Sequence, residues 1–315
     1  MPTLINLGHK SMNFSILINP LLSLLCFYTI FFYPQVAVIL LFFSPYFLLS
    51  YLENMERSKK TDIISLGIFL IGAIFLSLPS LYYLLFVIIP IFILIFIRDR
   101  MTNQSYLAPL LSPLPVFIII SLLLIFSSSF QEVIRNAILE FINTITAPFE
   151  NTVEKFSNLG VLSYLMADKE KATNYIIHIL PAMTYVVISI VVFVTDRLTS
   201  LKNETENTYI ERDYRLPDKF VWFLILGGFL ILIPIENIKF VSINILMICG
   251  VLYFFQGIQM ISILFDRLKI GGIFRGFIYA FLCTEPPVMA ILSLLGLFSI
   301  WFRPKWSIRE INTEK

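Results

Sequence analysis

A single carboxylate interrupts a long apolar run in the C-terminal part of the chain. Glu285 lies between Phe277 and Phe302 and is followed directly by Pro286 and Pro287. A charge at the centre of a bilayer costs about 2.5–3.5 kcal/mol on insertion scales, so Glu285 should face a protein interior or a water-filled cavity, or be protonated. The two prolines also deprive backbone carbonyls one turn earlier of their N–H partners. This pattern is typical of solute or ion sites in transporters. A hydrogen bond that locks two helices together explains it equally well.

The preceding apolar segment carries polar residues that could share a site with Glu285. Gln256, Gln259 and Asp266 recur at helical spacing. Gln256 lies ten residues before Asp266, and Glu285 lies ten residues after Arg275. At a rise of about 1.5 Å per residue, both would sit about 15 Å from the same membrane face. We therefore predict that Gln256, together with Gln259, and Glu285 line one intramembrane polar site.

Small residues recur at every fourth position just ahead of Glu285. They are Gly272, Gly276, Ala280 and Thr284. Such a stripe lets the backbone of another helix come close. We interpret it as a packing surface rather than a binding site, and Gly250 and Gly257 in the preceding segment could serve the same purpose.

Other kinds of chemistry find no support in the sequence. Cys26, Cys249 and Cys283 lie singly in apolar stretches, which predicts neither a disulfide framework nor a metal site. No nucleotide-binding loop, nucleophile elbow or carboxylate pair occurs, so we expect neither an enzyme nor a cofactor. The net charge of +2 comes without a dense basic block, so no nucleic-acid partner is expected.

The composition indicates which solvent surrounds these residues. Apolar residues make up 58% of the chain, charged residues only 14%, and the mean hydropathy is +0.85. Soluble domains have about 45–50% apolar and about 25% charged residues. The chain therefore has too few polar residues to cover its surface, and the apolar surface that remains must face lipid. This predicts a lipid bilayer as the main partner.

Apolar runs long enough to cross a bilayer predict an all-α, polytopic transmembrane bundle of about nine spans. The predicted spans are 13–33, 36–52, 61–78, 80–97, 107–129, 175–195, 219–235, 241–265 and 274–302. Pro34 and Pro79 fall between consecutive spans and predict tight helical hairpins. We divide the chain into an N-terminal bundle of about five spans (1–129), an extracytoplasmic amphipathic region (130–174) and a C-terminal bundle of about four spans (175–315).

The basic residues of the short loops predict the orientation, because cytoplasmic loops are enriched in Lys and Arg. With a cytoplasmic N-terminus, the basic residues of four loops fall on the cytoplasmic side. They are Arg57, Lys59, Lys60, Arg98, Arg100, Arg197, Lys202, Arg212, Arg215, Lys219, Arg267, Lys269 and Arg275. The cytoplasmic loop 196–218 contains the mixed-charge stretch Asn203–Asp218, which is expected to be solvated. An odd number of spans puts the basic tail outside, unless the last segment doubles back at Pro286–Pro287; we favour a single crossing.

Region 130–174 contains apolar residues at helical spacing. They are Val133, Ile134, Ala137, Ile138, Phe141, Ile142 and Ile145. The pattern predicts an amphipathic helix along the outer membrane face. It could serve as a lid or partner surface, but a helix that simply lies in the interface is the favoured interpretation.

Three short stretches of the C-terminal third resemble a known family. Tyr214–Asp218, the Leu252–Gly257 run and Gly296–Phe298 are similar to the YybS-like family of bacterial membrane proteins, a domain of unknown function. The resemblance implies a location in the bacterial cytoplasmic membrane. It also implies a fold distantly similar to the substrate-binding subunits of energy-coupling-factor vitamin transporters. Those subunits dock their partner through small residues spaced four apart in the first span, whereas this first span places Asn19, Pro20 and Ser23 among bulky residues.

Two classes of function remain open from the sequence. The first is a small-molecule carrier or substrate-capture protein with a polar site between its last two helices. The second is a non-transporting scaffold or sensor that binds membrane-protein partners and in which Glu285 is structural.

Overall fold

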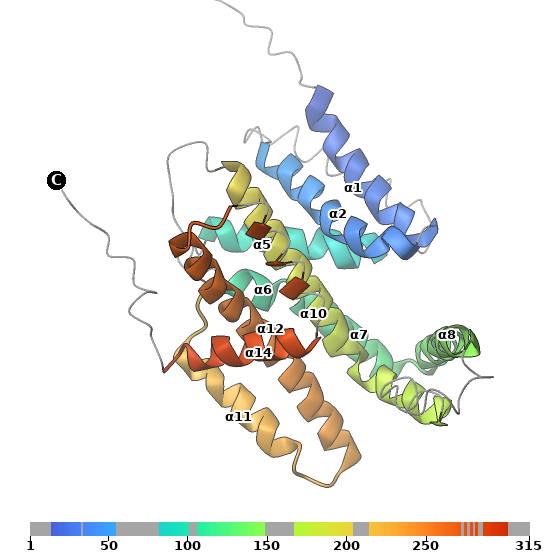
Figure 1. The fold of residues 1–315 in the computed structure, drawn as a ribbon. Helices are drawn as coiled ribbons and strands as arrows, with labels where there is room; N and C mark the ends of the chain where they lie inside the picture. Colours follow the sequence, from blue (N-terminus) through green and yellow to red (C-terminus); the bar gives the residue numbers. More distant parts are fainter. Residues whose placement is uncertain are drawn as a thin grey trace, which may run out of the picture. The chain divides into compact units, whose positions relative to one another are not determined.

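The computed structural model of the protein is built from α-helices. It describes residues 14–32, 34–54, 82–100, 106–148, 167–203, 214–271 and 286–301, with the pairs 274–275, 278–279 and 281–282. The helices are α1 (Phe14–Phe32), α2 (Pro34–Asn54), the π-helix η1 (Leu84–Ile88), α5 (Ile89–Arg100), α6 (Leu107–Leu111), α7 (Leu114–Phe126), α8 (Ser128–Thr146), α10 (Lys169–Asn203), the 3-10 helix η3 (Asp218–Phe220), α11 (Val221–Leu230), α12 (Glu236–Arg267) and α14 (Pro286–Phe298) (Figure 1). No β-strand occurs in these parts of the chain, so the predicted all-α class is confirmed.

Three helical stretches are long and apolar enough to cross a membrane. They are Leu107–Phe126, Lys169–Thr199 and Glu236–Phe265. Shorter apolar helices cover Ile18–Thr29, Leu84–Arg98 and Pro287–Phe298. These helices are consistent with a membrane protein, as the composition predicted. The count of about nine spans stays a prediction, and the predicted span 61–78 lies outside the described residues.

The chain forms two compact units. The first comprises Met1–Asp99 and Val191–Ile210, and the second comprises Arg100–Ile190 and Glu211–Lys315. The 35-residue helix α10 contributes its first part to the second unit and its last part to the first.

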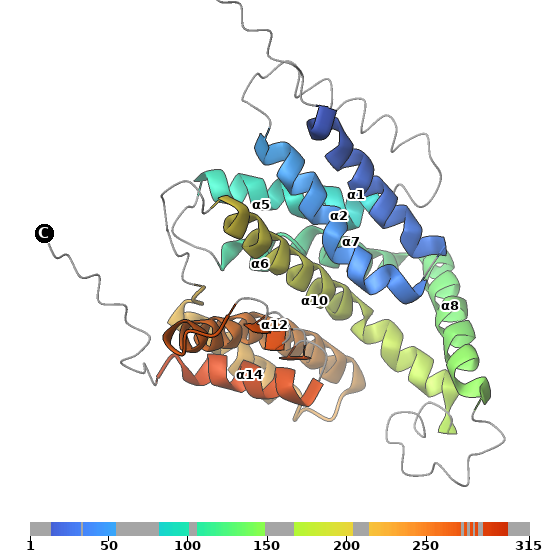
Figure 2. The same cartoon turned by 45° about the horizontal axis from the view of Figure 1, so that its top comes forward.

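In the first unit, buried hydroxyl groups lock α1 against α2. Pro34 begins α2 directly after α1, and the two helices pack along each other (Figure 2), which confirms the predicted hairpin. The Ser23 hydroxyl donates to the Ser44 carbonyl at 2.6 Å, and the Ser44 hydroxyl donates to the Ser23 carbonyl at 2.9 Å. Because Ser23 then has no proton left to give, Tyr83 donates to Ser23 Oγ at 2.7 Å. One network thus joins α1, α2 and the residue preceding η1.

The same unit contains an ion pair with little solvent exposure. Arg98 on α5 and Asp196 on α10 have side chains that are 14% and 13% exposed, and Arg98 Nη2 lies 2.7 Å from Asp196 Oδ1. Arg98 also donates from Nε to the same oxygen at 2.7 Å and from Nη2 to the Asp196 carbonyl at 3.1 Å. A shielded charge is tolerated where it is paired and hydrogen-bonded, so this contact ties α5 to the end of α10.

In the second unit, side chains of α10 satisfy backbone groups at the break between α6 and α7. Pro113 has no N–H, so the Pro109 carbonyl four residues earlier has no helical donor. Ser189 donates to this carbonyl at 3.0 Å, and the Tyr185 hydroxyl donates to the neighbouring Leu110 carbonyl at 2.8 Å. Side-chain donors of this kind are how membrane helices tolerate prolines.

A side chain of α12 binds the α10 backbone on both sides of Pro181. Around Pro181, the Asn244 side chain of α12 binds both ends of one rung of the α10 ladder: its Oδ1 accepts from the Ala182 N–H at 3.1 Å, and its Nδ2 donates to the His178 carbonyl at 2.9 Å. The His178 ring stacks on Phe240 of α12, with ring centroids 4.1 Å apart. These contacts join α10 to α12 beside Pro181.

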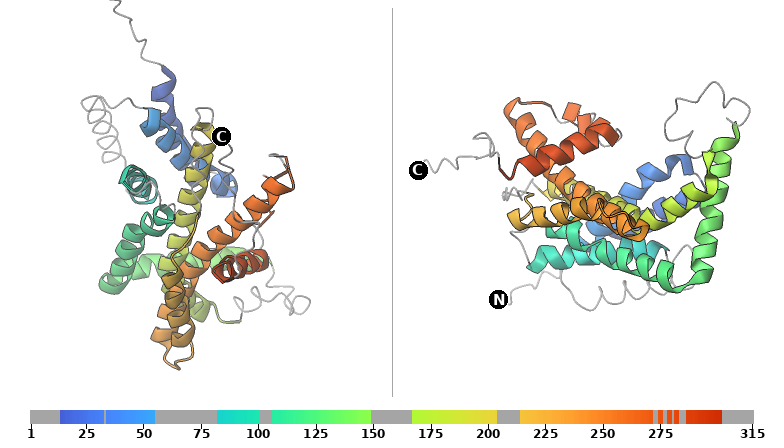
Figure 3. Two further views of the ribbon diagram at one scale, coloured as in Figure 1. Left: turned by 90° about the vertical axis from the view of Figure 1, so that its left-hand side faces the viewer. Right: turned by 90° about the horizontal axis from the view of Figure 1, so that it is seen from below.

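The predicted amphipathic helix is present as α8. Ser127 is extended (φ −117°, ψ 101°) and ends α7, and its hydroxyl accepts from the Phe130 N–H at 3.2 Å to cap α8. The chain therefore turns sharply, and α8 runs across the direction of α7 (Figure 3).

Two consecutive segments, the predicted loop 196–218 and the predicted span 219–235, differ from the sequence prediction. The predicted span 219–235 contains only the ten residues of α11 as α-helix, because the chain turns after Leu230 and Pro234 disfavours helix at the residue before it. The predicted loop 196–218 begins as helix, since α10 continues to Asn203, and its last residues include the buried side chains of Tyr214 and Leu216. Both α11 and α14 pack on the 32-residue α12.

Candidate functional site

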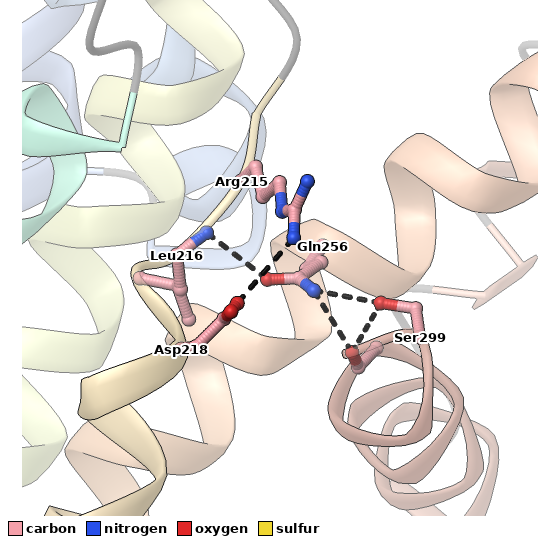
Figure 4. Close-up of polar contacts among 6 residues, drawn as sticks. Arg215, Leu216, Asp218, Gln256 and Ser299 are labelled. Carbon is pink, nitrogen blue, oxygen red and sulfur yellow. Dashed lines mark hydrogen bonds and ion pairs between the residues drawn. The ribbon is translucent and has the colours of Figure 1, made fainter. Parts of the chain in front are cut away.

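The side chain of Gln256 joins three segments of the second unit. Gln256 lies on α12 and is only 5% exposed. Its Oε1 accepts the Leu216 N–H at 3.1 Å, and its Nε2 donates to the Gly296 carbonyl at 3.1 Å and to Ser299 Oγ at 2.7 Å (Figure 4). The Leu216 N–H can only donate and the Gly296 carbonyl can only accept, so the amide oxygen of Gln256 must face Leu216 and its nitrogen must face Gly296. We call Leu216, Gln256, Gly296 and Ser299 the Gln256 cluster.

Two glycines bring α12 and α14 together at this point. A Cβ atom added to Gly257 would lie 2.1 Å from the Leu292 carbonyl oxygen, and one added to Gly296 would lie 2.0 Å from the Tyr253 carbonyl oxygen. Each glycine thus lies against the backbone of the other helix, as in small-residue packing of membrane helices. Gly257 therefore takes the packing role considered from the sequence, whereas nothing lies within 4 Å of a Cβ added to Gly250.

The segment ahead of α11 approaches the Gln256 cluster as extended backbone. Tyr214 and Leu216 are 2% and 1% exposed, while Arg215 and Asp218 point outward and form an ion pair of 3.4 Å (Figure 4). An extended segment has no helical acceptors for its N–H groups. The buried Leu216 N–H therefore needs a side-chain partner, and Gln256 provides it.

One turn before Gln256, a second polar group is buried. Tyr253 is 1% exposed, and its hydroxyl has no hydrogen-bond partner among the described residues. The Tyr253 ring packs edge-on against Phe220, with centroids 6.1 Å apart. A buried hydroxyl without a partner is costly, so Tyr253 provides a donor that a water or a solute could use.

The predicted site is only partly within the described residues. Gln256 is buried at the contact of α12 and α14, and Gln259 is half-buried one turn later on α12. Glu285 lies outside the described residues, as do the packing residues Gly272, Gly276 and Ala280. The shared site of Gln256, Gln259 and Glu285 therefore stays a prediction.

Sequence reasoning missed most partners of Gln256. Leu216 contributes only its backbone N–H, which has no signature in the sequence. Gly296 and Ser299 lie three residues apart on one face at the end of α14, and a search for small residues in that run would have found them. Within the described part of the chain, no group of three or more His, Cys, Asp or Glu side chains is arranged to hold a metal ion.

Comparison with known proteins identifies a family, but it finds no matching curated protein or solved structure. The model of a family described as predicted membrane protein (DUF2232) matches residues 21–299. No curated protein and no solved structure matches the chain. The matched region includes Gln256, both glycines of the α12–α14 contact and Ser299.

Proposed function

Since the chain belongs to the DUF2232 family of predicted membrane proteins, we propose that it is a carrier that captures a small polar solute between its last two helices. Gln259 and Glu285 contact the solute in this proposal, and Gln256 holds the surrounding backbone in place. The protein carries out no chemical conversion and needs no cofactor. It resides in the bacterial cytoplasmic membrane with a cytoplasmic N-terminus, as the basic loops favour.

The observation that carries the proposal is that Gln256 binds the backbone at the ends of two helices. The ten residues of α11 extend only about 15 Å, and α14 ends at Phe298 beside Gln256. A bilayer core is about 30 Å thick. The backbone before α11 and the C-terminal end of α14 both bind Gln256. Helices that stop short, with polar backbone at their ends, are how many transporters build solute sites at membrane depth.

The hydrogen bonds of Gln256 decide its role in the proposal. Its oxygen and its nitrogen are both engaged by protein groups, and the side chain is buried. A residue saturated in this way supports a site rather than binding the solute itself. Gln259 is less buried and lies one turn closer to the end of α12.

The finer family assignment belongs to the same proposal. A YybS-like identity and a distant likeness to the substrate-binding subunits of energy-coupling-factor transporters both agree with a solute-capture role. The supporting residues are the Tyr214–Asp218 stretch, Gln256 and Gly296, which carry the resemblance and also form or adjoin the Gln256 cluster.

We expect Glu285→Gln to remove solute binding without unfolding the protein. The purified protein is heated with a panel of amino acids, nucleosides and water-soluble vitamins. A solute present at 100 times its Kd stabilises the native state by about 2.7 kcal/mol. Glu285→Gln should melt like the native protein without solute and lose the solute-dependent rise in Tm.

Glu236→Gln is the matched control, because Glu236 is an exposed carboxylate in the first turn of α12. This variant should keep the full response. A solute that stabilises the native protein and Glu285→Gln equally would show that Glu285 does not bind it and would contradict the proposed site.

A non-transporting scaffold is the second candidate, and the saturation of Gln256 favours it. In that case the Gln256 cluster only packs α12 against α14, and the charged loops bind a partner protein. No solute of the panel should then raise the Tm, and purification from the native membrane under mild detergent should recover the chain with a stoichiometric partner.

A further inference from the structure

Helix α8 presents three different stripes along its 19 residues. Residues four apart lie on one face of a helix. Val133, Ala137 and Phe141 form an exposed apolar stripe, with Val133 and Phe141 65% and 62% exposed. A second exposed stripe is polar and consists of Glu132, Asn136 and Glu140. The third stripe faces the protein and consists of Arg135, Ile142 and Thr146.

Arg135 and Asn143 fix α8 to the first two turns of α10. Arg135 donates to Glu170 Oε2 at 3.1 Å and to Asn174 Oδ1 at 2.7 Å. Near the other end of α8, Lys169 donates to Asn143 Oδ1 at 2.9 Å. Two points of attachment hold the helix so that the apolar and polar stripes cannot exchange places by rotation.

These contacts also show the level at which α8 lies. Its partners belong to the polar start of α10, residues 169–174, directly before the apolar stretch that begins at Tyr175. Its own first residue follows the end of α7, where Ile125 and Phe126 are 67% and 81% exposed. The ends of two membrane-length apolar stretches therefore coincide with α8, which runs across the direction of α7 (Figure 3).

We propose that α8 lies in the headgroup region of one leaflet, with Val133, Ala137 and Phe141 inserted among the upper acyl chains and Glu132, Asn136 and Glu140 in water. A helix with separate apolar and polar sectors, lying along the membrane plane, buries its apolar face about 5–10 Å into this boundary. The charges of the polar stripe are acidic, so apolar insertion rather than attraction to anionic lipid holds the helix.

Lipid is the occupant because the apolar stripe continues a surface that already needs it. Ile125 and Phe126 end the helical stretch Leu107–Phe126, which α6 and α7 form together and which is long enough to span the bilayer, so side chains this exposed on it contact acyl chains. Val133 and Phe141 follow within 16 residues of Ile125. The lipid-facing surface of α7 therefore passes around the corner at Ser127 onto α8.

Neighbouring residues of α8 provide a matched test. Phe141→Cys and Glu140→Cys are made in the full chain with Cys26, Cys249 and Cys283 replaced by alanine, spin-labelled, and reconstituted into phosphatidylethanolamine–phosphatidylglycerol vesicles. The label at position 141 should collide several-fold more with dissolved oxygen than with a water-soluble nickel chelate. The label at position 140 should show the reverse. Val133→Cys and Glu132→Cys repeat the comparison near the N-terminal end of α8.

The outcomes separate lipid from other occupants. Equal access of the nickel chelate to positions 140 and 141 would place α8 in water and overturn the proposal. A label at 141 that is shielded from both reagents, in a chain that sediments as a dimer, would show that a second copy covers this face and would also overturn it. If the cysteine-free chain does not fold, photolabelling of the unmodified chain with an acyl-chain aryl diazirine lipid decides. Modification at Val133 and Phe141 supports the proposal, and its absence there contradicts it.

Discussion

Gly257→Ala should separate α12 from α14 and cost the protein about 3 kcal/mol or more of unfolding free energy. The added methyl group would lie 2.1 Å from the Leu292 carbonyl oxygen, a backbone atom that no side-chain rotation can move away. The helices must therefore move apart, and the hydrogen bonds of Gln256 to Gly296 and Ser299 would lengthen with them. Unfolding of the detergent-solubilised protein by sodium dodecyl sulfate measures the loss.

Gly250→Ala is the control for this prediction. Gly250 lies on the same helix two turns earlier, and no atom lies within 4 Å of its added Cβ. Alanine is the better helix former by about 0.5–1 kcal/mol, so this variant should be as stable as the native protein or slightly more so. Equal stability of Gly257→Ala and Gly250→Ala would show that the two helices do not approach as closely as the structure has them.

The second large effect is expected from Gln256→Leu. Leucine has a similar size but leaves the buried Leu216 N–H without an acceptor, which costs about 1–3 kcal/mol. It also removes the two bonds that Nε2 makes to Gly296 in α14 and to Ser299 just after it. We expect a total loss of about 2–3 kcal/mol in the same unfolding measurement. Proteolysis after Arg215 should accelerate as well, because the extended segment is released.

Asn244→Leu makes the same exchange of an amide for leucine and should cost less than about 1 kcal/mol. The two groups that Asn244 binds, the Ala182 N–H and the His178 carbonyl, are four residues apart on one helix and can pair with each other. The Leu216 N–H lies in an extended segment and has no such alternative acceptor. If both variants lost the same stability, the special importance of the Leu216 N–H would be refuted.

The sequence was informative wherever a local pattern determines the outcome. Long apolar runs predicted helices such as α1, α2, α10 and α12, because lipid leaves the backbone no other way to satisfy its polar groups. Pro34 marked the hairpin, and the spacing of Val133 and Phe141 predicted α8. These features depend on neighbours within a few residues.

The rest depends on pairings between distant segments. The burial of Tyr214 and Leu216 could not be read from a stretch rich in charged residues, because it results from their packing in the second unit. The mutual fit of Gly257 and Gly296 requires two helices to cross at one particular register. Gln256 was recognised as an important polar residue, but its partners are mainly backbone groups, which every residue has. The intended partner Glu285 lies outside the described residues.

The α6–α7 break has a consequence for how the protein is made. The hydrogen-bond donor of the Pro109 carbonyl is Ser189, which lies 80 residues later in the chain and is therefore synthesised later. At a synthesis rate of about 5–20 residues per second, the ribosome needs roughly 4–16 s to produce that donor. During this interval the carbonyl must keep a water molecule or an insertion factor as its partner. The break therefore acquires its final donor only once α10 has been translated, and an arrest of translation between the two would leave the Pro109 carbonyl without that donor.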